Sequence, residues 1–595
     1  MNKGVQFFSR MVASLMTSGL MVGVGVLTDF ALPKPAAAAE EIRLLIGGPL
    51  VFSVSVDSLE TYTQTGEIAE DLRLFTRFAN DQALAGLQQA LQSEIPLSVQ
   101  QVSNLGYSDL GEDVLLNLGK VVRPHIGLNG DRALRGAMLG AASEARETGT
   151  AWTPIDVLKH YPGKTIEIQA KDLLALRRLL ATYLGYNQAA IAAIQTQATQ
   201  EAANQVALPK DLTQPGPYAV ETITQTFTRS APRQTRAGMQ ENYTFDVDTF
   251  LPQLPEQSSQ PAPVVIVSHG YSDTKENFSF LGQHLATHGF VVLIPEHVGS
   301  DLAFRLNYTD GLLNTAMNPS EFISRPEEIS YLIDQLEAQV AASPDWAARL
   351  DLSRIGMVGH SLGASTAQSL AGATINRDRL AIACGQEQIT LNLSLYLQCQ
   401  ARFLPPETSN LQDARIKAVI SANGLSSQLY GPEGLENIEL PFMMVSASKD
   451  VVAPSIAEQI HPFFWVGSSE KYLAVMPEGS HFSFTAGEAT GAVSPLTQPG
   501  AEELAALVIG EHRDVGARYL SALNLAFWSV YLKEDRSYEP YLSAQYGTQL
   551  SVNEPVALNL VQQLTPEAIV TAYGQQPPTP IFPEPVGADR VQPQP

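Results

Sequence analysis

Residues 359–363 read Gly-His-Ser-Leu-Gly, which places Ser361 two positions from a glycine on either side. A serine hydroxyl is a weak nucleophile, and it attacks a carbonyl carbon only when a nearby base removes its proton. The pattern alone is not specific, but an apolar run, residues 355–358, precedes it and a helix-prone stretch, residues 362–373, follows it. This strand–turn–helix order predicts a nucleophile elbow with Ser361 at its tip, beside Gly359, His360 and Gly363.

The base is expected in the loop after the last parallel strand, because triads on this kind of sheet follow the chain order Ser, Asp or Glu, His. His481 lies there, just beyond the apolar run 472–476. The other histidines of this half of the chain do not follow the last strand directly: His269, His284, His288, His297, His360, His461 and His512. We therefore predict that His481 takes the proton of Ser361.

Asp450 follows the apolar run 441–445 and lies between the nucleophile and the histidine in chain order, where the acid of a triad is expected. The loop one strand earlier begins Ser-Ala-Asn-Gly at residues 421–424 and offers no carboxylate there. An aspartate that caps a loop turn is the alternative interpretation. By elimination we predict that Asp450 orients the imidazole of His481.

The negative charge that develops on an attacked carbonyl oxygen needs two backbone N–H donors. One is expected from Leu362, which directly follows the nucleophile and begins a helix. The other is expected from residues 268–272 (Ser-His-Gly-Tyr-Ser), after the first parallel strand, where Gly270 lets the backbone approach closely. We predict that the N–H of Tyr271 is this second donor.

Short, continuous apolar runs alternate with amphipathic helices, and such runs are typical of parallel strands buried on both faces. The predicted strands are residues 263–267, 290–294, 355–358, 417–420, 441–445 and 472–476, with helices at 277–288 and 327–340 among them. Alternating segments at 222–228 and 243–250 predict an antiparallel start. The catalytic part is therefore expected to be a mostly parallel, doubly wound α/β sheet.

The preceding unit is of mixed but mainly helical character, with a hairpin at 43–56 and helices at 81–91 and 171–204. It contains no combination of nucleophile, base and acid that suggests catalysis. The predicted organisation is a signal peptide at 1–39, an accessory domain at 40–205, a linker at 206–221, a catalytic domain at 222–550 and a Pro- and Gln-rich tail at 551–595.

The N-terminus has the layout of a secretory signal. Lys3 and Arg10 precede the uncharged residues 11–28, and four alanines, residues 36–39, end the segment. Cleavage after Ala39 is expected, which makes the protein exported, either periplasmic or secreted. An uncleaved membrane anchor is the alternative. No later segment is long and apolar enough to span a bilayer.

Cys384 and Cys399 are the two cysteines, too few for a disulfide scaffold or a Cys-rich metal site. In an oxidising compartment they would suit one disulfide, and two separately buried thiols are the other interpretation. The net charge of −24 argues against nucleic acid and anionic membrane surfaces as partners, because like charges repel.

Several segments together resemble the platelet-activating-factor acetylhydrolase and predicted dienelactone hydrolase branch of the α/β-hydrolases: residues 264–270, 295–297, 325–328, 350–355 and 359–363. Residues 41–205 look like the accessory domain of unknown function that precedes such a hydrolase in a bacterial family. The resemblance implies Ser361, Asp450 and His481 as the triad, with Tyr271 and Leu362 as oxyanion donors.

The chain also departs from these relatives. Dienelactone hydrolases use a cysteine nucleophile where this chain has Ser361. In the acetylhydrolase branch the acid follows an earlier strand, where this chain has Asn423. Position 364 is alanine, where a second glycine is frequent.

The sequence thus predicts a serine hydrolase that cleaves carboxylic esters, lipid or small acyl esters, through an acyl-enzyme and without a metal or organic cofactor. Residues 298–324 are expected to form a cap, and Phe482 and Phe484 to shape an apolar acyl pocket. Two alternatives come from other classes of protein. One is an inactive hydrolase fold that binds a ligand, and the other is a protein that binds a partner through its N-terminal domain.

Overall fold

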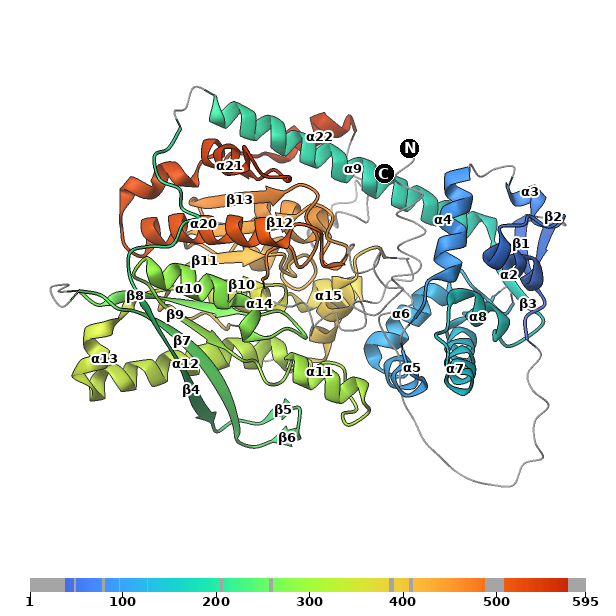
Figure 1. Cartoon of the computed structure of the whole chain (residues 1–595), viewed down its shortest axis with the longest axis horizontal. Helices are drawn as coiled ribbons and strands as arrows, with labels where there is room; N and C mark the ends of the chain where they lie inside the picture. The colour runs from blue at the N-terminus through green and yellow to red at the C-terminus, as the bar shows by residue number, and fades with distance from the viewer. Residues whose placement is uncertain are drawn as a thin grey trace, which may run out of the picture.

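The computed structural model describes residues 38–575 except for 48–49, 77–80, 96, 126, 204–206, 256–259, 385–389, 406–409 and 487–507. The predicted signal peptide lies outside these residues apart from Ala38 and Ala39, and so do residues 576–595 of the predicted tail. Figure 1 shows a small N-terminal unit beside a large α/β unit, with the long helix α9 (Ala170–Ala202) running along both.

The large unit is built on a sheet that has nine strands in the described part of the chain, in the order β14-β13-β12-β11-β10-β8-β9-β7-β4. The strands are β4 (Val220–Arg229), β7 (Tyr243–Pro252), β8 (Ala262–Ser268), β9 (Val291–Pro295), β10 (Leu350–His360), β11 (Ile416–Ala422), β12 (Phe442–Ala447), β13 (Lys471–Met476) and β14 (Asn559–Val561). Strands β8 to β13 are parallel to one another. The pairs β4–β7, β7–β9 and β13–β14 are antiparallel. The predicted α/β fold and its antiparallel start are confirmed.

The parallel strands are continuously apolar because both faces of the sheet are covered. In β8, Val264 and Ile266 face the hydrophobic cluster under α12 (Glu321–Ala342) and α14 (Leu362–Leu370), whereas Val265 and Val267 face the cluster under α10 (Ser279–Thr287) and α20 (Arg513–Tyr531). Burying each such side chain contributes about 1.5–3 kcal/mol. The carboxyl ends of these strands carry the loops of the candidate site.

Two predicted helices differ at their starts. Residues 277–288 form a 3₁₀ turn, η1 (Lys275–Phe278), followed by α10. The second helix, α12, begins at Glu321, so Pro326 lies inside it rather than at its start. Proline has no N–H and breaks one helical hydrogen bond. The helix continues because Ile329, Leu332 and Leu336 are buried against the sheet.

The N-terminal unit has its own sheet, in the order β2-β1-β3, and its own hydrophobic core. The predicted hairpin forms, with β1 (Glu41–Gly47) antiparallel to β2 (Leu50–Ser55), and β3 (Thr165–Gln169), which the sequence did not reveal, is parallel to β1. The helices are α2 (Val56–Thr65), α3 (Arg73–Thr76), α4 (Asp81–Gln92), α5 (Val99–Gly106), α6 (Asp109–Gly119), α7 (Asp131–Thr148) and α8 (Pro154–Lys159).

Helix α9 corrects the predicted boundary at residue 205. It contacts the N-terminal sheet, but Tyr183, Tyr186 and Ile194, which lie from its middle onward, belong to the hydrophobic core of the large unit. The predicted linker also lies against that unit, because Leu212 is buried and its N–H donates to the Tyr546 hydroxyl at 3.2 Å. None of the described helices is long and apolar enough to cross a membrane.

The predicted tail begins too early. Residues 551–575 include β14, which pairs with β13, and α22 (Pro566–Tyr573), which packs on α9. The remaining described elements are β5 (Arg233–Thr235), β6 (Gly238–Gln240), α11 (Leu302–Thr309), α13 (Pro344–Arg349), α15 (Arg377–Ala383), α16 (Ser394–Gln398), η2 (Cys399–Phe403), α17 (Gly431–Leu435), η3 (Ile456–Ile460), α18 (His461–Trp465), η5 (Arg536–Leu542) and α21 (Ala544–Ser551).

Candidate active site

Ser361 lies in the sharp turn between β10 and α14, with φ 56° and ψ −121°. A non-glycine residue held at positive φ costs about 1–3 kcal/mol and is typical of functional sites. The turn requires glycines because backbones approach closely. A Cβ on Gly359 would lie 2.0 Å from the Gly363 carbonyl oxygen, and a Cβ on Gly363 would lie 2.0 Å from the Ser268 carbonyl oxygen. The elbow geometry thus follows from the sequence motif.

The structure brings the three residues of the predicted triad together. His481 Nε2 lies 3.0 Å from Ser361 Oγ, and His481 Nδ1 lies 2.7 Å from Asp450 Oδ2. All three side chains are buried. Because a carboxylate accepts at Nδ1, this nitrogen carries the imidazole proton, and Nε2 is left to accept the serine proton.

Asp450 serves two purposes through its two oxygens. Oδ2 faces His481, while Oδ1 accepts hydrogen bonds from the N–H groups of Val452 and Ala453, both at 2.8 Å. The same carboxylate thus caps the turn with one oxygen and contacts the imidazole with the other. The two hydrogen bonds from the turn fix the carboxylate, so that its orientation toward His481 is set before any substrate binds.

Two side chains hold the backbone of His481 from behind. The His481 carbonyl oxygen accepts from Asn423 Nδ2 at 2.8 Å and lies 2.8 Å from His360 Nε2. Burial lowers the pKa of His360 to about 3, so the ring is neutral and Nε2 donates. Asn423 also accepts from Ala447 N–H at 3.0 Å, which ties the acid strand to the base loop. The sequence showed only that position 423 has no carboxylate.

The predicted oxyanion donors flank Ser361. A Cβ on Gly270 would lie 3.2 Å from the Ser361 Cβ, so the loop that carries Tyr271 passes close to Ser361. Leu362 is the first residue of α14, and an N–H in a first helical turn has no partner within its helix. The helix dipole there favours a developing negative charge.

Of the two predicted pocket aromatics, one lies at the site. The Phe482 ring is half-buried and stands edge-on to the His481 ring, with centroids 5.1 Å apart. Phe484 instead lies in the core under α10 and α20, so its predicted role is wrong. In the turn after His481, Phe482 is half-buried whereas Ser483, Phe484 and Thr485 are all buried, a difference that the sequence there could not reveal.

The predicted cap, residues 298–324, contains α11 and packs on α5 of the N-terminal unit. The Tyr308 hydroxyl donates to the Asn104 carbonyl at 2.6 Å, and Asn104 Nδ2 donates to the Tyr308 carbonyl at 3.0 Å. At its other end the cap reaches the site, because the Tyr271 hydroxyl donates to the Ala316 carbonyl at 2.5 Å.

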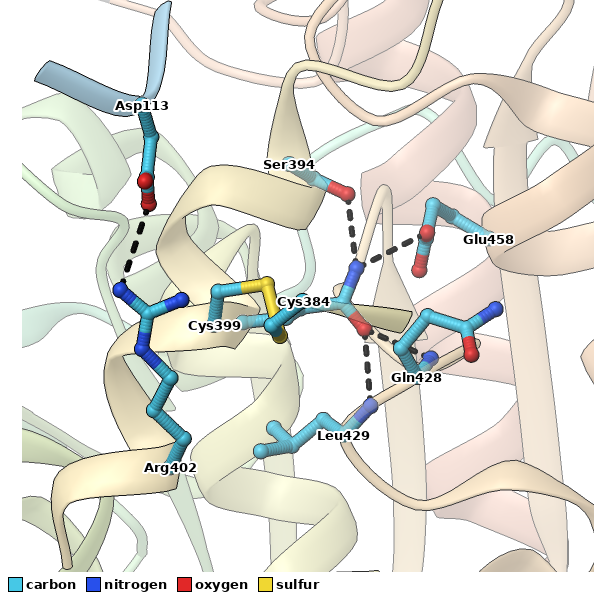
Figure 2. The surroundings of a disulfide bond; sticks show 9 residues. Asp113, Cys384, Ser394, Cys399, Arg402, Gln428, Leu429 and Glu458 are labelled. Atoms are coloured by element: carbon cyan, nitrogen blue, oxygen red, sulfur yellow. Dashed lines mark hydrogen bonds and ion pairs between the residues drawn. A yellow bond between two sulfur atoms is a disulfide. The ribbon is translucent and has the colours of Figure 1, made fainter. Parts of the chain in front are cut away.

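Cys384 and Cys399 form a disulfide, with an S–S distance of 2.05 Å, which resolves the two interpretations of these cysteines. Figure 2 shows the bridge between α15 and η2, close to the Arg402–Asp113 ion pair that joins this segment to α6 of the N-terminal unit at 3.6 Å. The same segment touches the acid loop, because Ser394 N–H donates to the Val452 carbonyl at 2.8 Å.

A buried ionic network lies behind the oxyanion loop and was not found from the sequence. It contains two arginines and two glutamates whose side chains are fully buried: Arg233, Arg325, Glu321 and Glu328. The only signal was that residues 325–328 contributed to the family resemblance. Among the described residues, no group of three or more His, Cys, Asp or Glu side chains could hold a metal ion.

Two known families match parts of the chain. Residues 38–169 match the family described as "Alpha/beta hydrolase of unknown function (DUF1400)", and residues 243–320 match the family described as "Platelet-activating factor acetylhydrolase, isoform II". No curated protein matches the chain. The first match covers the N-terminal unit, and the second spans the loop that carries Tyr271. With the sheet order, these matches indicate an α/β-hydrolase fold with an N-terminal domain, and residues 243–320 are similar to the platelet-activating factor acetylhydrolase family.

Proposed function

We propose that the chain is a serine hydrolase that cleaves carboxylic esters through an acyl-enzyme. The observation that carries this proposal is the hydrogen-bonded series from Asp450 through His481 to Ser361, with distances of 2.7 and 3.0 Å, at a strained strand-to-helix turn. Side chains in this order make the serine hydroxyl a nucleophile and give it a proton acceptor in the correct tautomer.

In the proposed reaction, Ser361 Oγ attacks the ester carbonyl while His481 Nε2 takes its proton. The oxyanion of the tetrahedral intermediate accepts from the N–H groups of Tyr271 and Leu362. His481 then gives the proton to the leaving alcohol, which leaves an acyl group on Ser361. Water, deprotonated by His481, releases the acid and restores the serine. Asp450 stays ionised throughout and holds the imidazolium.

The surroundings favour an uncharged acyl group, lipid or small. The apolar ring of Phe482 stands edge-on to the proposed base, with the ring centroids 5.1 Å apart. Apolar surroundings select substrates by burial rather than by charge.

We further propose that residues 1–39 are a secretory signal and that the mature protein is periplasmic or secreted. The Cys384–Cys399 disulfide supports this proposal, because disulfides persist in oxidising compartments. The measurement is the N-terminal sequence of the protein recovered from the cell envelope and the medium. A mature protein that begins at Glu40 is expected, and one that retains residues 1–39 would contradict cleavage.

The test of activity combines a fluorophosphonate probe with p-nitrophenyl esters of increasing chain length. We expect the wild type to be labelled and to hydrolyse the esters, and Ser361→Ala to lose both properties while it unfolds at the same temperature. A wild type that is neither labelled nor active on any ester would contradict the proposal and favour a ligand-binding protein with a hydrolase fold.

A further inference from the structure

Arg325 of α12 is fully buried, and all three nitrogens of its guanidinium group face the loops behind the nucleophile. Nη1 donates to the His269 carbonyl at 2.6 Å, and Nη2 donates to the Gly270 carbonyl at 3.1 Å. Nε donates to Ser300 Oγ at 2.8 Å. A planar fork of five N–H donors suits such a set of acceptors, whereas an ammonium group on a flexible chain could reach only part of it.

These contacts fix the direction of one particular N–H. The Gly270 carbonyl and the Tyr271 N–H belong to the same peptide unit, which is planar and trans, so they point in opposite directions. A donor that holds the carbonyl therefore also aims the N–H. Gly270 lies next to both residues: its carbonyl accepts from Arg325, and a Cβ on Gly270 would lie 3.2 Å from the Ser361 Cβ.

A second donor acts on the same carbonyl. His269 Nδ1 lies 2.8 Å from the Gly270 oxygen, while His269 Nε2 accepts from the His297 N–H at 3.0 Å. Because Nε2 is an acceptor, the ring proton of the neutral imidazole is on Nδ1, which donates to Gly270. The next residue is also held, since Ser272 N–H donates to the Ser300 carbonyl at 2.8 Å.

The charged side chains around Arg325 offset the free-energy cost of burying its guanidinium group. Glu321 accepts from Arg233 Nε at 3.1 Å and Nη2 at 3.0 Å, and lies 3.6 Å from Arg325 Nε. Glu328 pairs with Arg233 and with His297 Nδ1, the latter at 2.6 Å. Burial lowers the pKa of Arg325 to about 10, so it stays a cation at neutral pH, and two cations face two carboxylates. An unpaired buried charge would be strongly destabilising.

We propose that Arg325 is a positioning residue that aims the Tyr271 N–H at the oxyanion by holding the Gly270 carbonyl from behind. This proposal rests on the proposed function, since it assigns Tyr271 as an oxyanion donor. Removal of a whole oxyanion donor lowers kcat by about 10²–10³-fold. Because Arg325→Lys leaves the donor present but misdirected, we expect a loss of kcat of about 10–100-fold with KM nearly unchanged.

The experiment compares Arg325→Lys and Arg325→Gln with Arg379→Lys in the full chain. Arg379 is a matched control because it is also buried and donates through Nε to a backbone carbonyl, that of Ser427 at 3.0 Å, but not to the oxyanion loop. Active sites are counted by the endpoint of fluorophosphonate labelling, so that kcat refers to folded enzyme only. Thermal unfolding is measured in parallel.

Two readouts separate positioning from a purely structural role. A trifluoromethyl ketone forms a tetrahedral oxyanion on the serine, so its affinity should fall in proportion to kcat in the Arg325 variants and stay unchanged in Arg379→Lys. Hydrogen–deuterium exchange of residues 268–272 needs no substrate. It should rise in both Arg325 variants, through the loosened Ser272 N–H, and not in the control.

Arg325 variants that lose thermal stability but keep kcat, ketone affinity and exchange within about twofold of the wild type would overturn the proposal. Unchanged exchange of residues 268–272 would overturn it as well, whatever the kinetics. If the wild type hydrolyses no ester, the proposed function fails, and the exchange comparison still decides whether Arg325 positions the loop.

Discussion

The N-terminal unit and the catalytic unit differ in whether their charged side chains are buried or exposed. In the catalytic unit, Arg325 and Glu321 are fully buried beside the oxyanion loop. In the N-terminal unit, an ion pair such as Lys164–Glu40 is exposed to solvent, and the core is apolar around Trp152. Buried charges rarely add stability over a well-packed apolar core. We infer that the catalytic unit keeps them because they orient backbone at the site, and that the N-terminal unit has no such task within its own core.

The N-terminal unit instead contributes through its contacts. Helix α5 packs on the cap, and Asp113 of α6 pairs with Arg402 beside the disulfide. Helix α9, which runs along both units, adds a contact to the acid loop, because Asn187 donates to the Ser448 carbonyl at 3.0 Å. These contacts reach both sides of the candidate site. This arrangement favours a supporting role for the unit over an independent partner-binding module.

The largest expected effect contrasts a histidine of each unit. His481→Ala should lower kcat/KM by at least about 10⁴-fold, because Ser361 then has no base. His160→Ala is the matched control, since both contacts of its ring lie within the N-terminal unit: Nδ1 lies 2.9 Å from the Asp156 carbonyl oxygen, and Nε2 lies 3.1 Å from Glu144. Equal activity losses in both variants would contradict the assignment of the base to the catalytic unit alone.

The disulfide supports the segment that joins the units. Its loop spans 15 residues, for which chain entropy gives about 3 kcal/mol of stabilisation. We expect Cys384→Ser together with Cys399→Ser to lower the free energy of unfolding by about this amount in a urea titration. A loss below about 0.5 kcal/mol would mean that the segment is held by its other contacts, such as the hydrogen bonds that Gln398 accepts from the N–H groups of Gln428 and Leu429.

Buried titratable groups should make the stability of the catalytic unit depend on pH. Burial raises the pKa of Glu296 to about 8 from its ordinary value of 4.5. Between these values the folded state holds a proton that the unfolded state has lost, so stability falls as pH rises, by at most about 1.4 kcal/mol per pH unit for one group. Denaturant titrations between pH 5 and 8 should show a flatter slope for Glu296→Gln, and an unchanged slope would contradict this assignment.

The smallest expected effect concerns the contact of α5 with the cap. Tyr308→Phe removes one hydrogen bond, and Asn104→Ala removes those to the Tyr308 carbonyl at 3.0 Å and to the Thr309 carbonyl at 3.4 Å. A typical hydrogen bond contributes about 1 kcal/mol. We expect KM for long-chain esters to rise about two- to fivefold with kcat largely kept, since about 1 kcal/mol corresponds to this range. Asn129→Ala removes a similar bond, to the Leu116 carbonyl, inside the N-terminal unit, and should leave KM unchanged. Identical KM values in all three variants would contradict a supporting role of the N-terminal unit at the candidate site.

The features that could be predicted from the sequence are those that depend on local residue pattern and on chain order. Residues 263–267 and the other apolar runs are strands because both faces of the sheet are buried, and the elbow follows from glycines at contacts where a Cβ cannot fit. His481 and Asp450 were placed by their order along the sheet.

What escaped prediction depends on contacts between distant segments. Arg325 and Asn423 act on backbone carbonyls that no pattern links to them. Helix α9 was assigned to one domain because its Ala-rich sequence has no boundary signal, although its tyrosines pack on the catalytic core. β14 has only three residues in a segment that resembles a tail, and pairing with β13 decides its structure.

The central claim is that Ser361 carries the acyl group. Incubation with an aryl carbamate, which deacylates slowly, should release one equivalent of aryl alcohol and leave a carbamoyl group on the tryptic peptide 355–377, at Ser361, as read by tandem mass spectrometry. The same treatment of His481→Ala should leave that peptide unmodified. Turnover of esters by the wild type without an adduct at Ser361, or with the adduct on another residue, would contradict the account.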